Sequence, residues 1–153
     1  MLVEFQQAFA DLVASPALCR AVRDDASILD RRYELTDRER TRLVGLARHS
    51  GMACSCMLYR ANRLAPLVMN LPQLCRALGD QLRPILDDYW TTYPNSDVHF
   101  VVESHRFCEF VARELRLGRP LPLDVGTAIE TEMPPLAMRF EASYTETARR
   151  PRE

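Results

Sequence analysis

The sequence predicts a mainly α fold: one orthogonal helical bundle over residues 1–118, followed by a Pro-rich, less regular C-terminal extension over residues 119–153 that packs on the bundle or extends from it. Three observations support this prediction. Apolar residues recur at helical spacing through most of the first part, Ser, Thr and Pro stand at the expected helix starts, and Gly or Pro follows the expected ends. A chain of 153 residues, of which 47% are hydrophobic, can bury a core without disulfide or metal support.

Two short helices are predicted to form a hairpin near the N-terminus. Between residues 3 and 14, Phe5, Phe9 and Leu12 lie at helical spacing. Ser15 and Pro16 then end this helix and begin another, because Ser is a preferred N-cap and Pro fits the first helical position, where no amide donor is needed.

The clearest helix start lies at Thr36. Thr36 and Glu39 have the spacing of a capping box, in which the Thr hydroxyl accepts a hydrogen bond from the amide of the third helical residue and the Glu carboxylate accepts one from the cap amide. This helix is predicted to run to about His49 and to end at Gly51, because glycine adopts a left-handed backbone conformation at low cost.

The next predicted helix, residues 53–64, has two distinct sides. At 100° per residue, the apolar side is expected to be buried and comprises Cys54, Met57, Leu58, Ala61, Leu64 and Ala65. The opposite side is expected to face solvent and comprises Cys56, Tyr59, Arg60 and Arg63. Pro66 is predicted to break the chain after this helix, because proline lacks an amide donor.

Three further helices are predicted over residues 71–78, 81–91 and 98–117, with Gly79 ending the first and Asp97 capping the last. Helical spacing is weak in the C-terminal extension, which is rich in proline. There we predict a short helix over residues 124–132, an edge strand or extended arm over residues 136–144, and a frayed polar end.

Composition and charge exclude several classes of function. The net charge of -1 lacks the basic balance of a general nucleic-acid binder, although all 20 basic residues are arginine. No stretch approaches the roughly 18 apolar residues of a membrane span, and the N-terminus does not resemble a signal peptide, so we predict a cytoplasmic protein with no membrane association. Five glycines cannot supply a P-loop or a dinucleotide-binding fingerprint.

The cysteines do not form a metal-binding pattern. Their odd number, five, and their apolar surroundings indicate reduced core residues. Cys54 and Cys56, with His49 nearby, suggest zinc or iron, but residues two apart on a helix point about 200° from each other and cannot share one ion. We therefore predict no metal, no cofactor and no catalytic residue. An enzyme that uses Cys56 or His105 stays open as an alternative.

One stretch is locally basic and is a candidate partner-binding surface. Residues 48–83 contain five arginines and a single acid. Tyr59, Arg60 and Arg63 share one helix side, and Tyr and Arg are enriched at interface hot spots. The alternative is that Arg60 and Arg63 pair internally with acids of neighbouring helices, such as Asp87 or Asp88. The sequence alone leaves both interpretations open.

A nucleic-acid interpretation is weaker. The string LTDRER at residues 35–40 looks like the opening of a response-regulator type helix-turn-helix. The segment that would form the reading helix contains Pro66 and an apolar stripe, so nucleic-acid binding is not expected. A DNA-binding or regulatory helical module is nevertheless the alternative function.

Five motifs within residues 35–117 carry a family resemblance: LTDRERTRL, HSGM, LYRANRLAPL, LPQLCRALG and ESHRFCEFV. In this order they resemble the small partner proteins, or fused C-terminal domains, of the DUF692-type multinuclear non-haem iron oxidative enzymes of bacteria. Those systems modify cysteines in ribosomally made peptides, as in methanobactin-type biosynthesis.

The resemblance implies a non-catalytic accessory subunit. Such a protein docks on an iron-containing barrel oxidase, which holds the iron ligands, and helps to present the ribosomal precursor peptide. By the same resemblance, Tyr59, Arg60, Asn62 and Arg63 lie at the interface, together with Arg106. If a peptide is bound, the extended segment expected at residues 136–144 is a candidate for adding a strand to it.

Overall fold

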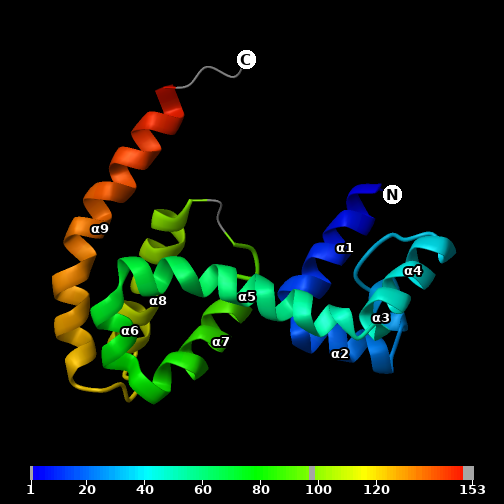
Figure 1. The fold of residues 1–153 in the computed structure, drawn as a ribbon, viewed down its shortest axis with the longest axis horizontal. Coiled ribbons are helices and arrows are strands. Elements are labelled where there is room, and N and C mark those ends of the chain that lie inside the picture. Colours follow the sequence, from blue (N-terminus) through cyan, green and yellow to red (C-terminus); the bar gives the residue numbers. More distant parts are fainter. Residues whose placement is uncertain (1, 97–98, 150–153) are drawn as a thin grey trace. The chain divides into compact units, whose positions relative to one another are not determined.

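The computed structural model describes residues 2–96 and 99–149, and this part of the chain contains helices and turns but no strand (Figure 1). The predicted mainly α fold is confirmed. The helices gather into two compact units, Met1–Asn62 and Arg63–Glu153. The predicted boundary after residue 118 falls inside the second unit.

The first unit contains α1 (Leu2–Ala14), α2 (Pro16–Asp24), α3 (Ser27–Asp30), α4 (Asp37–Arg48) and the N-terminal part of α5 (Gly51–Asn70). The N-caps predicted at Ser15 and Thr36 are confirmed. The Ser15 hydroxyl accepts a hydrogen bond from the Leu18 amide at 3.1 Å. At α4, the Glu39 amide donates to the Thr36 hydroxyl at 3.3 Å, and the Thr36 amide donates to the Glu39 carboxylate at 2.9 Å.

The core of the first unit forms where α2 packs against α1 and α4. Its fully buried side chains are Ala8, Leu12, Val22, Leu29, Leu43 and Ala47. Gly51 begins α5 instead of ending α4, so its predicted role is wrong. The reason is local: His49 is the extended C-cap of α4, and its Nδ1 accepts a hydrogen bond from the Gly51 amide at 3.0 Å.

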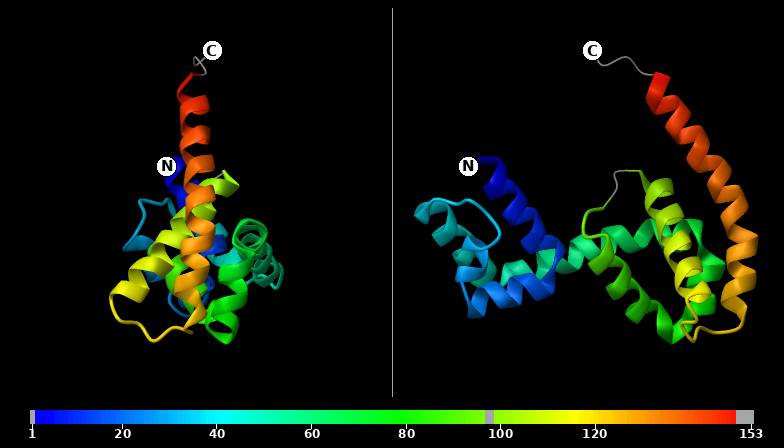
Figure 2. Two further views of the ribbon diagram at one scale, coloured as in Figure 1. Left: turned by 90° about the vertical axis from the view of Figure 1, so that its left-hand side faces the viewer. Right: turned by 180° about the vertical axis from the view of Figure 1, so that it is seen from behind.

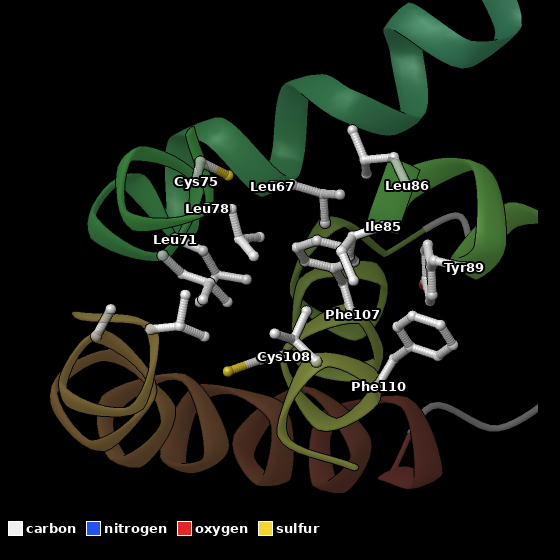
Figure 3. Packing of buried hydrophobic residues seen from close by; sticks show 14 of the residues in the cluster. Leu67, Leu71, Cys75, Leu78, Ile85, Leu86, Tyr89, Phe107, Cys108 and Phe110 are labelled. Carbon is white, nitrogen blue, oxygen red and sulfur yellow. The ribbon is translucent and has the colours of Figure 1, made fainter. Parts of the chain in front are cut away.

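The second unit contains the C-terminal part of α5, α6 (Pro72–Leu78), a 3-10 turn η1 (Gly79–Gln81), α7 (Leu82–Thr92), α8 (Phe100–Arg116) and α9 (Asp124–Arg149). Figure 3 shows its core, in which Tyr89 packs against Phe107 and Phe110 with ring centroids 5.2 and 5.5 Å apart. Leu71, the N-cap of α6, and Leu78 of α6 close the other end of this core. The predicted end of α6 at Gly79 is confirmed by its positive φ of 49°.

The prediction that Pro66 ends a helix is wrong, because α5 continues through it to Asn70. An interior proline costs about 3 kcal/mol in an isolated helix. Here Pro66 is buried, and its carbonyl accepts a hydrogen bond from the Ser104 hydroxyl of α8 at 3.0 Å. These tertiary contacts offset the general tendency of proline to end a helix, on which the prediction was based.

The predicted strand or extended arm over residues 136–144 is also wrong. Those residues belong to α9, which includes Pro134 and Pro135 and lies along α8 and α6 (Figure 2). The helix is stabilised by a buried row at helical spacing, namely Val125, Ala128, Glu132 and Leu136, which continues on both sides of the prolines. The predicted cap of α8, Asp97, lies outside the described residues.

Candidate partner-binding surface

The two sides of α5 are buried in the opposite sense from the prediction. Cys56 is buried, and its thiol donates to the Leu12 carbonyl of α1 at 3.5 Å, whereas Cys54 is exposed. Met57 and Leu58 were expected in the core but are 64% and 62% exposed. Periodicity shows that a helix has an apolar side; it does not show which side the neighbouring helices cover.

Arg63 is not a surface residue. It is 3% exposed, its Nε donates to Oε1 of Glu103 at 2.7 Å, and a terminal guanidinium nitrogen donates to the Pro94 carbonyl at 3.1 Å. Internal pairing, the alternative that the sequence left open, therefore describes Arg63. The partner in this buried ion pair is Glu103 of α8.

Aromatic rings of α7 surround this buried ion pair. The Arg63 guanidinium carbon lies 5.4 Å from the Tyr89 ring centroid and 6.0 Å from that of Trp90. The Tyr89 hydroxyl donates to the Glu103 carbonyl at 3.3 Å, and burial raises the pKa of Tyr89 above its usual range. The cluster joins the C-terminal part of α5 to α7 and α8 through buried contacts. It therefore contributes to the stability of the second unit.

Three of the other predicted site residues belong to the first unit and one belongs to the second. Tyr59 and Arg60 are half-buried and Asn62 is exposed, all on the part of α5 that belongs to the first unit. Arg106 is half-buried on α8, where its guanidinium carbon lies 5.6 Å from the Tyr93 ring centroid. The structure thus brings Arg63 and Arg106 to one group of aromatic rings at the C-terminal end of α7, within the second unit.

Sequence reasoning missed the exposed apolar side chains of α5. In the first unit these are Met57 and Leu58, and in the second unit Val68 and Met69, which are 48% and 73% exposed. The apolar periodicity of α5 led to the prediction that Met57 and Leu58 are buried. Only the packing of the other helices shows that these side chains face solvent.

Catalytic chemistry has little support among the described residues. No group of three or more His, Cys, Asp or Glu side chains there is placed to hold a metal ion. Burial raises the pKa of the Cys75 thiol to about 11 and that of Cys108 to about 12, which keeps both protonated and weakly nucleophilic. Burial also raises the pKa of Cys56, and His105 stacks on Phe140 with ring centroids 4.4 Å apart.

Comparisons with protein-family models, with curated proteins and with solved structures found no match to this chain. In the described part of the chain, no helix combines the length and the hydropathy that a membrane crossing requires.

Proposed function

We propose that this protein is a non-catalytic accessory subunit that docks on an iron-dependent peptide-modifying oxidase and helps to present a ribosomal precursor peptide. The observation that carries the binding role is the exposure of large apolar side chains on α5. The identity of the partner rests on the motif resemblance within residues 35–117.

The exposed side chains of α5 have the properties of an interface. Met57 and Leu58 are adjacent and more than half exposed, and Asn62 provides an exposed polar group one turn further on. Full burial of one such apolar side chain contributes about 1.5 to 3 kcal/mol, a stabilisation that a partner gains and the isolated chain does not. Met is also frequent at binding surfaces because its flexible thioether adapts to a partner.

The structure changes which residues of the LYRANR motif are proposed to contact the partner. Tyr59, Arg60 and Asn62 remain proposed contact residues on α5. Arg63 is proposed to act indirectly, by holding α5 to α8 through Glu103. Arg106, half-buried beside Tyr93, is proposed as a peripheral contact.

The test is co-purification of the tagged chain with a DUF692-type oxidase from the same organism, followed by iron analysis of the complex. Three double variants, each of which replaces two exposed apolar side chains by glutamine, should be compared: M57Q/L58Q, V68Q/M69Q and the control L117Q/L123Q. Leu117 and Leu123 are 75% and 98% exposed but lie outside α5.

We expect a stoichiometric complex that contains iron, weakened at least tenfold by M57Q/L58Q or V68Q/M69Q and less than twofold by the control. Equal weakening by all three would contradict the assignment to α5. Absence of any complex with the wild-type chain would contradict the accessory function itself. Circular dichroism of each variant establishes that it has folded.

A further inference from the structure

The exposed side of α4 is a basic row centred on a glycine. α4 packs against α1 and α2 through Leu43 and Ala47, which are fully buried (Figure 1). On the opposite side, Arg38, Arg42 and Gly45 follow one another at intervals of four and three residues and are all exposed. Arg48 is exposed one turn further along. These four residues, which we name the basic row, lie within an arc of about 120°.

Gly45 has no structural reason to be a glycine. It lies inside a regular helix, its φ is not positive, and a Cβ added there would meet nothing within 4 Å. A glycine in an exposed helix interior destabilises the helix by about 0.5 to 1 kcal/mol relative to alanine. What it does provide is bare backbone, which lets another chain approach closely between flanking arginines.

Among the residues that the structure describes, the ion pairs of the first unit do not include the arginines of the basic row. Those pairs use other residues: Arg31 with Asp25, and Arg40 with Asp30 and Asp37. Glu39 lies one turn before Arg42, and its carboxylate accepts hydrogen bonds from the Thr36 amide and hydroxyl. These hydrogen bonds lower the pKa of Glu39 more than its attraction to Arg42 does.

We propose that the basic row binds an acidic helical segment of the precursor peptide. This inference rests on the proposed function and deepens it by naming the chemistry of the peptide. From Arg38 to Arg48 the row spans about 15 Å of helix, which suits a short segment. The guanidinium groups pair with carboxylates spaced one turn apart, and Gly45 allows the two helices to approach closely.

A peptide fits the surface better than duplex DNA does. The first unit carries nine arginines and eight acids, a net charge of only +1. Asp30, Glu34 and Asp37 are exposed near the N-terminal end of the row, where a long phosphate backbone would meet them. A short acidic segment can be confined to the arginines.

The test uses the full chain and fluorescence anisotropy at low ionic strength, where exposed charge pairs are strongest. The probe is a fluorescein-labelled helical peptide with glutamates four residues apart on one side. A peptide of the same composition with its glutamates distributed around the helix, and a DNA duplex, serve as comparison probes. Variants R38Q/R42Q and R20Q/R23Q remove the same charge, the latter from exposed positions on α2.

We expect R38Q/R42Q to weaken binding of the one-sided peptide about fivefold to tenfold, and R20Q/R23Q less than twofold. Gly45→Gln, which adds bulk without contacting this chain, should weaken it by a similar factor, whereas Ala53→Gln at an exposed site on α5 should not. Equal effects of the two arginine pairs, or no effect of Gly45→Gln, would overturn the proposal. So would tighter binding of the duplex or of the scrambled peptide.

The two proposals fail separately. If the oxidase does not bind the wild-type chain but the peptide results are as expected, the accessory function is wrong and the basic row remains an acidic-peptide site. If the oxidase binds through α5 and the basic-row variants bind the peptide normally, only the basic row is wrong.

Discussion

The two units of this protein hold their helix ends in different ways. In the first unit, Ser15 caps α2 and Thr36 caps α4, each through an amide only three residues away. In the second unit, α6 has no side-chain cap of its own at Leu71. Instead, the carboxylate of Glu132 on α9 accepts hydrogen bonds from the Gln73 and Leu74 amides, both at 2.9 Å, across 59 and 58 residues of chain.

The two units also differ in how far their ion pairs are buried. The Arg63–Glu103 pair of the second unit is almost completely excluded from solvent, whereas the Arg40–Asp30 pair of the first unit is 37% and 41% exposed. Local caps and exposed pairs persist when the packing is perturbed. Long-range caps and buried pairs exist only in the packed structure, so the second unit should depend more strongly on single residues.

The largest expected effect is that of Arg63→Ala. The substitution leaves the Glu103 carboxylate buried without its charge partner, which typically costs about 3 to 5 kcal/mol. Trp90, the one tryptophan, lies in the second unit, so urea unfolding followed by its fluorescence measures the loss there.

The matched control is Arg40→Ala, which removes the exposed pairs with Asp30 and Asp37 and should cost about 1 kcal/mol or less by circular dichroism. Equal losses in the two variants would contradict the distinction between the units. This prediction also means that a charge reversal at Arg63 cannot map an interface, since it would unfold the second unit.

Alkaline pH should destabilise the second unit through its buried thiols. The unfolded thiols ionise near pH 8.5, but burial raises the folded pKa of Cys75 to about 11 and that of Cys108 to about 12. The unfolded state therefore binds fewer protons than the folded state once the pH exceeds the unfolded pKa. Stability is complete below that value and is lost as the pH rises toward the folded pKa values.

We expect the free energy of unfolding to fall by about 2 to 3 kcal/mol from pH 9 to pH 10, or about 1.4 kcal/mol for each thiol. The measurement is urea unfolding by Trp90 fluorescence in the presence of a reductant. The C75A/C108A variant should show a smaller slope with pH, and Cys54→Ser, at an exposed site, should show the wild-type slope. A slope that C75A/C108A does not alter would refute the assignment.

The cap that Glu132 provides to α6 should contribute more to the free energy of unfolding than the cap that Thr36 provides to α4. Glu132→Gln keeps the shape of the side chain but removes the charge that accepts two amide hydrogen bonds, and it should cost about 1.5 to 3 kcal/mol. Thr36→Ala should cost about 1 kcal/mol. Hydrogen exchange at the α6 amides, resolved by NMR, should become faster in Glu132→Gln and stay unchanged in Thr36→Ala. Faster exchange at these amides in Thr36→Ala would contradict the view that the two caps act independently.

Substitutions of two glycines are expected to have effects of opposite sign. Gly45→Ala should stabilise the first unit by about 0.5 to 1 kcal/mol, because the helix is regular there and the space is open. Gly79→Ala should destabilise the second unit by more than about 1 kcal/mol, because its φ of 49° is strained for residues with a Cβ. Thermal unfolding by circular dichroism distinguishes the two signs, and a stabilised Gly79→Ala would contradict the backbone argument.

The sequence by itself determined the features that depend on neighbouring residues. The helical class, the caps at Ser15 and Thr36, and the end of α6 at Gly79 all follow from local hydrogen bonds and backbone preferences. Such interactions are completed within one turn of chain, so a pattern of a few residues is enough to predict them.

Only the tertiary structure decided which surfaces are buried and how far some helices extend. The exposure of Met57 and Leu58, the pairing of Arg63 with Glu103, and the passage of α5 through Pro66 depend on residues far away in the sequence. The physical reason is that burial and charge pairing are properties of two surfaces in contact, and a single amphipathic pattern describes only one of them.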